Sequence, residues 1–225
     1  MVEPGEILVA RTPGRRGPET REAIHAAAID LFARLGYHAT SMRALAAAAE
    51  VQPAAIYHWY PNKEAILVQL QDDFMEQLTV RVRAAMELQD RPAMKLAAAV
   101  REHVLYHGLH TDEAFVTDSE IRALTDEPRR ALIAKRDDYQ AIFAGTIRDG
   151  IRDGSLRSSD VHVATYAILL QCTGVALWFD PDGPLGLEAV AELHIELVLG
   201  SLQASSELIG EAIELVARRA ATEVV

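Results

Sequence analysis

The sequence predicts an all-α fold, with an N-terminal helix-turn-helix module of three helices followed by a larger C-terminal helical bundle. Apolar residues recur at helical spacing in almost every periodic segment, and no segment shows the alternation of a half-buried strand. Several prolines and glycines mark the boundaries between these segments. Half of the 225 residues are hydrophobic, so the chain can bury a substantial core.

Residues 1–18 are rich in proline and glycine and are expected to form a flexible basic arm. A first helix is expected from about Glu19 to Leu35, because one stripe along it is apolar. Gly36 is expected to end this helix, as glycine often does directly after the last helical residue. The stripe consists of Ile24, Ala28, Leu31, Phe32 and Leu35.

Three helix starts follow in close succession. Thr40 or Ser41 can supply the N-cap hydroxyl of a second helix. Pro53 suits the first turn of a third helix that begins near Gln52. Asn62 can cap a long fourth helix. The apolar faces are Met42, Leu45, Ala46 and Ala49 on the second helix, and Leu67, Leu70, Phe74 and Leu78 on the fourth.

Six further helices are expected beyond residue 88. Pro92, Pro128 and Pro184 lie near helix starts, and Gly154 and Gly183 mark breaks. The expected helices span residues 92–109, 113–125, 128–152, 160–179, 185–203 and 205–221.

Positive charge is concentrated near the N-terminus of a chain whose net charge is -11. Seven basic and four acidic residues lie between Arg11 and Lys63, so the first 63 residues carry +1 and the remainder -12. Binding of a polyanion such as DNA requires local positive charge. The asymmetry therefore indicates a basic reading module attached to an acidic body.

The most specific pattern lies between Gly36 and Glu64, where two short helices meet at a turn around Val51. It comprises Gly36-Tyr37-His38-Ala39-Thr40-Ser41-Met42-Arg43-Ala44-Leu45-Ala46, then Val51, then Ile56-Tyr57-His58-Trp59-Tyr60-Pro61-Asn62-Lys63-Glu64. This pattern resembles the TetR family of bacterial transcriptional regulators over about residues 19–67. Two positions depart from it, because many members have serine in place of Gln52 and phenylalanine in place of Tyr60.

The residue types in this module suit contacts to a DNA backbone. Thr40 and Ser41 offer hydroxyl and backbone N–H groups to a phosphate. Tyr57 and Trp59 each combine an apolar ring with one polar hydrogen, and Lys63 can neutralise a phosphate. The resemblance implies the same role for these last three. The predicted DNA-binding residues are Thr40, Ser41, Arg43, Gln52, Ala54, Ala55, Tyr57, His58, Trp59 and Lys63.

Few of these side chains can read base sequence. Arg43 is the best candidate for a bidentate contact to guanine, and Gln52 and His58 are the polar candidates on the third helix. Ala54 and Ala55 can contact thymine methyl groups.

The two tyrosines can each be either a core ring or a DNA contact, and the basic arm can be either bound to DNA or solvated. Tyr60 is expected to be a core ring, whereas Tyr57 is expected to face DNA. The arm residues Arg11, Arg15 and Arg16 either enter the minor groove or remain in solvent.

The body mixes apolar residues with scattered polar ones, which is the composition of a small-molecule pocket. In the resembling family the body houses such a pocket, and its ligand changes the spacing of two DNA-reading heads. The run from Trp178 to Leu185 is also similar to acyl-CoA-responsive regulators of lipid and sterol-ring catabolism in that family. An acyl-CoA or another hydrophobic small molecule is therefore expected. The predicted ligand-binding residues are His103, Tyr106, His107, Phe115, Tyr139, Phe143, Gln171, Cys172, Val175 and Trp178.

His103, His107 and His110 share one helical face, with a spacing that is compatible with a metal site. A polar face or pocket lining is the preferred interpretation, and neither a metal nor a cofactor is expected. Cys172 is the single cysteine, so the chain has no internal disulfide. It is expected to be a buried small hydrophobe rather than a redox sensor.

The segments 160–179 and 185–203 are apolar on more than one face, which indicates burial within the chain or an interface. One reading module binds weakly, so a homodimer is expected, with half-sites roughly 34–36 Å apart. In the resembling family, the last two large helices form a four-helix dimer interface. No membrane partner is expected, because charges are expected to interrupt the apolar stretches before membrane-spanning length.

These observations predict a ligand-responsive, DNA-binding transcriptional regulator in the cytoplasm. The resemblance to the TetR family, and not the residues themselves, implies a repressor released from a palindromic operator by its effector. An activator, a metal-responsive regulator and a helical interaction protein without DNA binding are the alternatives. An enzyme is not expected, because the sequence has no glycine-rich phosphate loop, nucleophile elbow or metalloprotease motif. The predicted domains are the arm (1–18), the helix-turn-helix domain (19–65) and an effector-binding and dimerisation domain (66–225).

Overall fold

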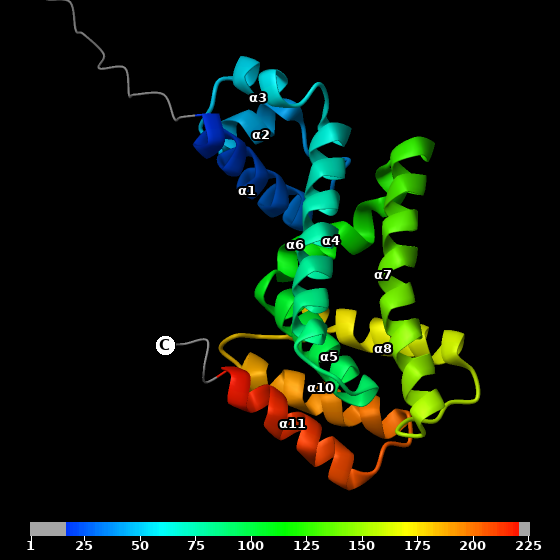
Figure 1. The fold of residues 1–225 in the computed structure, drawn as a ribbon. Helices are drawn as coiled ribbons and strands as arrows, with labels where there is room; N and C mark the ends of the chain where they lie inside the picture. Colours follow the sequence, from blue (N-terminus) through cyan, green and yellow to red (C-terminus); the bar gives the residue numbers. More distant parts are fainter. Residues whose placement is uncertain (1–16, 221–225) are drawn as a thin grey trace, which may run out of the picture.

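The computed structural model describes residues 17–220, including side chains as far as Ala217. All regular elements in this range are helices, as the sequence predicts (Figure 1). The arm residues Arg11, Arg15 and Arg16 lie outside the described range. The elements are α1 (Gly17–Leu35), α2 (Met42–Ala48), α3 (Pro53–Trp59), α4 (Lys63–Glu87), α5 (Pro92–Leu109), α6 (Thr111–Ser119), the 3-10 helix η1 (Glu120–Ala123), α7 (Asp126–Asp153), α8 (Val161–Thr173), α9 (Val175–Trp178), α10 (Leu187–Ser201) and α11 (Ser206–Ala220).

Several predicted boundaries are corrected by the structure. α1 begins at Gly17 instead of Glu19, because Pro18 is tolerated in the first helical turn, where its missing N–H loses no hydrogen bond. The helix expected at 113–125 is divided into α6 and η1, and the helix expected at 160–179 is interrupted at Gly174. Helical periodicity identified these segments, but it did not locate the breaks within them.

The head comprises α1, α2, α3 and the first turn of α4, and it is packed around one apolar centre. Phe32, Leu45, Ile56 and Ile66, one from each helix, are fully buried and belong to the same core. Removal of this apolar surface from water stabilises the small module. Leu35 was predicted on the apolar stripe of α1 but is 54% exposed, because it lies in the last turn of the helix.

Local signals in the sequence set the turns of the head. Gly36 has a φ of 81°, a left-handed conformation that ends α1 and that glycine adopts at little cost. The Ser41 hydroxyl accepts a hydrogen bond from the Ala44 backbone N–H at 3.1 Å and so caps α2. Asn62 caps α4 in the same way, through the N–H of Ala65 at 2.8 Å.

The remaining helices form the body, and α5 lies at its centre. α5 packs against α4, α7, α8, α10 and α11. α4 runs from the head into the body, while α10 and α11 lie at the end of the body away from the head (Figure 1). Movements of α4 against the body helices therefore change the position of the head.

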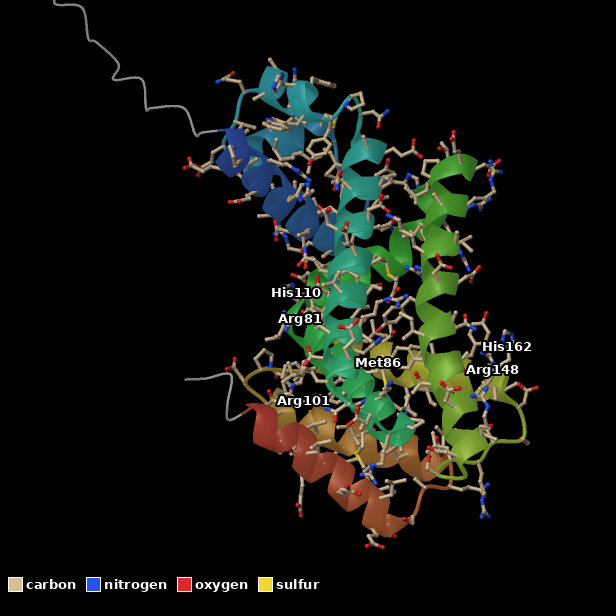
Figure 2. All side chains as sticks on the ribbon, in the orientation of Figure 1. Arg81, Met86, Arg101, His110, Arg148 and His162 are labelled. Atoms are coloured by element: carbon tan, nitrogen blue, oxygen red, sulfur yellow. The ribbon has the colours of Figure 1, made fainter. Side chains whose placement is uncertain are left out.

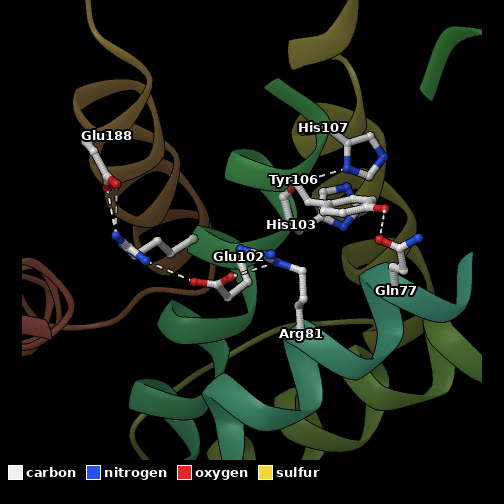
Figure 3. Close-up of polar contacts among 8 residues, drawn as sticks. Gln77, Arg81, Glu102, His103, Tyr106, His107 and Glu188 are labelled. Atoms are coloured by element: carbon white, nitrogen blue, oxygen red, sulfur yellow. Dashed lines mark hydrogen bonds and ion pairs between the residues drawn. The ribbon is translucent and has the colours of Figure 1, made fainter. Parts of the chain in front are cut away.

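A chain of ion pairs joins α4, α5 and α10. Arg81 pairs with Glu102 at 3.6 Å, Glu102 with Arg101 at 2.9 Å, and Arg101 with Glu188 at 2.9 Å (Figure 3). Arg81 and Arg101 are also labelled in Figure 2. The Arg101 and Glu102 side chains are only 11% and 16% exposed, so these central charges are paired in a partly desolvated position.

The window Val161–Trp178 is long and apolar enough to cross a membrane by length and composition. This finding corrects the expectation that charges interrupt every apolar stretch. Only 22% of the window is buried within the described structure, and α8 and α9 divide it at Gly174. The rest of the window is not buried within the chain, and an exposed apolar surface of this kind is typical of an interaction site.

Candidate functional site

Polar and aromatic side chains are exposed on α2 and α3 of the head. Tyr57 is 56% exposed and Trp59 is 38% exposed, which is unusual for large rings with apolar bodies. The predicted DNA-binding residues at the surface are Ser41, Arg43, Gln52, Ala54, Tyr57, His58 and Trp59, and Ala55 is half-buried. Seven of the ten predicted DNA-binding residues are therefore exposed on or next to two short helices, and their contact with DNA stays a prediction.

The geometry of α3 leaves its polar groups available. Gln52 is the N-cap residue, but its side chain makes no capping hydrogen bond. The His58 and Trp59 rings meet edge to face, with centroids 5.4 Å apart. A Cβ built on Gly17 would lie 3.4 Å from the Trp59 ring, so this ring lies beside the first turn of α1.

Thr40 and Lys63 have different positions from those predicted. The Thr40 hydroxyl is buried and points to the carbonyls of Gly36 at 3.0 Å and Leu31 at 3.3 Å, so it is not available to a phosphate. The Lys63 ammonium donates to the carbonyls of Tyr37 at 2.5 Å, Thr40 at 2.6 Å and His38 at 3.4 Å. Both residues stabilise the turn before α2, and their predicted phosphate contacts are corrected accordingly.

Tyr60 is a core ring, as predicted. It is 6% exposed, and its hydroxyl lies 2.5 Å from Nε2 of His25 on α1. This histidine supplies the partner that the hydroxyl needs in place of solvent. Burial raises the pKa of Tyr60 and lowers the pKa of His25, so the pair is held as neutral groups.

The body contains a cavity of about 510 Å³, a size suited to a small molecule. Its walls are mostly apolar and come from α4, α5, α6, α7, α8 and α9. Four of the predicted ligand-binding residues line it: His103, His107, Phe115 and Tyr139. The body therefore has a cavity lined by four of the ten predicted residues, and ligand binding there stays a prediction.

Two stacked histidines from α5 form the polar floor of the cavity. Their ring centroids are 4.1 Å apart with an interplanar angle of 8° (Figure 3). His103 contacts the Tyr139 hydroxyl through Nδ1 at 2.8 Å and the Thr173 hydroxyl through Nε2 at 3.1 Å. His107 Nδ1 donates to the backbone carbonyl of His103 at 2.9 Å.

Burial fixes the charge of this pair. It lowers the pKa of His103 well below its usual value and lowers that of His107 to about 4. Both rings are therefore neutral at physiological pH. Because Nδ1 of His107 is the donor, Nε2 of that ring is a hydrogen-bond acceptor.

Six predicted ligand-binding residues do not line the cavity. The Tyr106 hydroxyl contacts Gln77 at 3.4 Å, and the Tyr106 ring lies 5.0 Å from that of Phe74. The other five are the buried Phe143, Cys172 and Val175 and the exposed Gln171 and Trp178. Each belongs to a helix that borders the cavity without lining the cavity itself; Phe143, for example, shares a face of α7 with Tyr139 and packs against its ring, with centroids 5.4 Å apart.

Several cavity residues were missed by the sequence analysis. Arg136 and Gln140 of α7 and Asp118 and Ser119 of α6 are polar, and nothing in the sequence distinguishes them from surface residues. Phe74 and Leu78 were identified on the apolar stripe of α4, but the stripe predicts burial and not contact with a cavity. The remaining unpredicted lining residues are Met75, Tyr166, Leu169, Leu170, Thr173, Gly174, Ala176 and Leu177.

The α6–η1 segment, residues 111–123, connects the cavity to the head. Asp118 and Ser119 line the cavity, and the next residue, Glu120, accepts a hydrogen bond from the Tyr37 backbone N–H at 3.1 Å. The Thr117 carbonyl accepts from Gln71 of α4 at 3.3 Å. This segment therefore contacts the cavity, the turn before α2 and the helix that carries the head.

An apolar face is exposed on α8, α9 and α10. Leu170 and Leu177 are 76% and 73% exposed, and both also line the cavity. The sequence analysis left burial and interface formation open, and the structure shows both buried and exposed apolar residues on these helices: Ile195 is buried, for example, while Leu197 is exposed. The large exposed apolar residues of this face are Val163, Tyr166, Leu170, Leu177, Trp178, Leu193 and Leu197.

His103 and His107 of α5 and His110, the residue directly after α5, do not converge on one point. His103 and His107 stack, while His110 pairs with Glu113 at 2.8 Å and is labelled in Figure 2. Within residues 17–217, no group of three or more His, Cys, Asp or Glu side chains is arranged to hold a metal ion. Cys172 is fully buried, as predicted, and burial raises the pKa of its thiol to about 12, so it stays protonated and unreactive.

Two family profiles match the chain. A profile described as bacterial regulatory proteins, tetR family, matches residues 24–70, which cover most of the head. A profile described as tetracyclin repressor-like, C-terminal domain, matches residues 89–202, which cover most of the body. Together they span the exposed α2–α3 surface and much of the cavity.

Similar proteins match most of the chain. The transcriptional repressor KstR2 of Mycolicibacterium smegmatis is 26% identical over 197 residues, covering 86% of this chain and 95% of KstR2. The structure of the regulator PfmR from Thermus thermophilus is 32% identical, with a TM-score of 0.73, covering 80% of this chain and 98% of PfmR. The structure of AibR in complex with isovaleryl coenzyme A and operator DNA is 26% identical, with a TM-score of 0.73, covering 79% and 97% of the two chains.

Proposed function

The chain belongs to the TetR family of bacterial transcriptional regulators, and we propose that it is a dimeric repressor which a hydrophobic ligand releases from a palindromic operator. One observation carries this proposal: the α6–η1 segment contacts both an apolar cavity and the head. Because one segment touches both sites, a ligand that displaces it is expected to displace the head as well.

The α2–α3 surface is proposed to bind the operator. Tyr57, Trp59 and Ser41 face solvent and carry the hydrogen-bond donors that phosphate oxygens accept. Arg43 is exposed and offers the planar guanidinium that pairs with guanine in the major groove. Among the described residues of α2 and α3 it is the one arginine or lysine, so base discrimination depends strongly on it.

The effector is proposed to occupy the cavity. Phe74, Leu78, Leu169 and Leu170 supply apolar walls, and the stacked histidines supply a polar floor. AibR was solved with isovaleryl coenzyme A, which makes an acyl-CoA a reasonable first ligand to test on this chain.

A second copy of the chain is proposed to cover the apolar face of α8, α9 and α10. Apolar residues this exposed are typical of an interface rather than of a solvated surface. Two heads held by one interface bind a palindrome with the combined affinity of both. The ligand then favours a dimer in which the heads no longer match the half-sites.

Binding of the protein to DNA flanking its own gene tests the proposal. Fluorescence anisotropy across a salt series is expected to show tight, salt-dependent binding. Addition of short- and medium-chain acyl-CoA compounds, or of ligand recovered from the purified protein by native mass spectrometry, is expected to weaken it. Binding that is unaffected by every such ligand would contradict the ligand-responsive mechanism, and no binding at low salt would contradict the assignment as a repressor.

A further inference from the structure

A chain of four charged side chains joins the helix that carries the head to a helix of the proposed interface (Figure 3). Arg101 of α5 is at its centre: Nη1 donates to Glu102 at 2.9 Å, and Nη2 donates to the two carboxylate oxygens of Glu188 at 3.0 and 2.9 Å. Glu102 also pairs with Arg81 of α4 at 3.6 Å. Glu188 lies in the first turn of α10. The chain therefore runs from α10 through α5 to α4.

The two cations and two anions of this chain balance one another. Each carboxylate oxygen of Glu102 contacts a different arginine, since Oε1 contacts Arg101 and Oε2 contacts Arg81. The Arg101 and Glu102 side chains are largely buried, so solvent screens their attraction less than that of a surface pair. Arg81 also lies over the Tyr106 ring of α5, with Cζ 5.8 Å from the ring centroid. These directional contacts restrain the position of α4 against α5.

Apolar packing is incomplete beside this chain. A hollow of about 230 Å³ is lined by residues of α4, α5 and α11, and Arg81 and Glu102 form part of its wall. The small residues of the wall are Ala84, Ala85 and Ala98. Close-packed side chains resist the displacement of one helix against another, whereas a hollow supplies no atoms that do so. The ion pairs therefore contribute more to the alignment of α4 here than they would beside a fully packed core.

Given the proposed dimeric repressor, on which this step rests, we infer that Arg81 is a positioning residue that sets the separation of the two heads. α10 belongs to the face on which a second copy is proposed to lie, and α4 carries the head. The alignment of α4 on α5 and α10 therefore decides where each head lies relative to the two-fold axis. Arg81 lies about 27 Å along α4 from Lys63, at roughly 1.5 Å per residue, so a tilt of about 5° displaces the head by ~2 Å.

Operators whose half-sites are moved together or apart by one base pair test this role. One base pair shifts a half-site by about 3.4 Å along the duplex and by about a tenth of a turn around it. Fluorescence anisotropy is expected to show that the wild type binds these operators roughly tenfold more weakly than the operator it selects from random DNA. Arg81→Met keeps an apolar side chain but removes the guanidinium, and it is expected to lose less than about threefold. An equal loss in both proteins would overturn the inference.

The substitution is compatible with the fold, because Glu102 keeps its contact with Arg101 and no buried charge is left unpaired. Arg81→Lys retains the positive charge and is expected to keep most of the wild-type spacing preference. Arg83→Met is the matched control, since Arg83 is exposed on the same helix and forms no ion pair with any residue that the structure describes. It is expected to behave as the wild type. An equally relaxed spacing preference in Arg83→Met would show that the ion-pair chain is not the cause.

A distance measurement without DNA separates this role from the repressor assignment. Ala26 is exposed on α1, so a spin label on Ala26→Cys reports the position of the head. Cys172 is fully buried, with a pKa of about 12, and stays unlabelled. Pulsed electron paramagnetic resonance of the full-length dimer is expected to give one narrow distribution of head-to-head distances, which Arg81→Met broadens about twofold.

An unchanged distribution in Arg81→Met would overturn the inference even in a protein that binds its operator. A narrow distribution that Arg81→Met broadens, in a protein that binds no operator, would support the positioning role and contradict the repressor assignment alone. The absence of any head-to-head distance in the wild type would contradict the dimer and overturn both.

Discussion

Two adjacent hydroxyl residues at the start of α2 have different roles. Thr40 is buried, with its hydroxyl directed at the carbonyls of Leu31 and Gly36, whereas Ser41 is exposed and caps α2. The first hydroxyl therefore stabilises the turn between α1 and α2. The second is accessible to a phosphate while it also stabilises the helix.

We expect Thr40→Val to lower the free energy of unfolding by about 1–2 kcal/mol, because it removes a buried hydrogen-bond donor at nearly constant volume. Operator affinity of the folded protein is expected to remain within about twofold of the wild type. Ser41→Ala is the matched variant and is expected to weaken both stability and operator binding. Chemical denaturation and anisotropy measure the two quantities. A loss of operator affinity in fully folded Thr40→Val would show that its hydroxyl contacts DNA after all.

The buried histidines make stability depend on pH. His107 has a pKa of about 4 in the folded protein, and an unfolded histidine has a pKa of about 6.5. The unfolded state therefore binds more protons between these values, and the free energy of unfolding falls as pH decreases through this range. The difference corresponds to about 3 kcal/mol for His107, and His103 acts in the same direction.

Urea denaturation at neutral pH and at about pH 5 measures this effect. The variant His107→Phe cannot take up the proton, so its stability is expected to fall less over the same pH interval. Equal pH dependence in the variant and the wild type would contradict the neutral, buried state of His107.

Sequence reasoning identified the exposed side chains of the head better than the walls of the cavity, for a physical reason. Short helices with few buried positions leave little doubt about which residues face outward, as Arg43 and Tyr57 illustrate. In the body, helices have neighbours on several sides, so helical position alone did not separate His103 from Phe143. Arg136 could not be predicted, because its position in the cavity wall depends on contacts with α6 that only the fold creates.

At the scale of elements, α6 and η1 lie between the cavity and the head. Glu120 contacts the turn before α2 through the Tyr37 N–H, and the Thr125 N–H donates to Glu64 of α4 at 2.6 Å. Both contacts join the body to the head over long sequence separations. The sequence predicted one helix here, because the tightening from α-helix to 3-10 helix at Glu120 leaves no periodic signal.

We expect Glu120→Ala to weaken this coupling, because it removes the acceptor for the Tyr37 N–H. Ligand affinity for the cavity is expected to change by less than about threefold. The ligand-induced loss of operator affinity is expected to shrink several-fold from the roughly 5- to 150-fold typical of allosteric proteins. Operator titrations with and without the ligand that releases the wild type measure it, and the exposed Glu127→Ala is the control. Full coupling in Glu120→Ala would show that another contact transmits the signal.

At the scale of the whole molecule, the apolar face of α8, α9 and α10 is the surface through which we propose that two copies pair. Its residues also supply part of the cavity wall, since Tyr166, Leu170 and Leu177 belong to both. A partner placed on this face lies next to these cavity-lining residues. The window Val161–Trp178 is apolar enough to cross a membrane by composition, and we interpret its exposed apolar residues as part of the proposed dimer interface.

We expect Leu197→Glu to convert the dimer to a monomer, because it places a charge within the apolar interface. Val80→Glu on α4 is the matched control, since Val80 is exposed to the same degree, 61%, on a different surface. Sedimentation velocity of the purified proteins measures the association state. A dimer that persists in Leu197→Glu would place the interface elsewhere.

The central claim is that two copies of the α2–α3 surface read an operator with two-fold symmetry. Selection of binding sites from a random double-stranded DNA library tests it directly. The wild type is expected to enrich an inverted repeat whose half-sites lie about one or a few helical turns apart. Arg43→Ala is expected to lose preference at one position in each half-site, worth about 1–3 kcal/mol. Enrichment of a single unpaired site, or of no sequence, would contradict the claim.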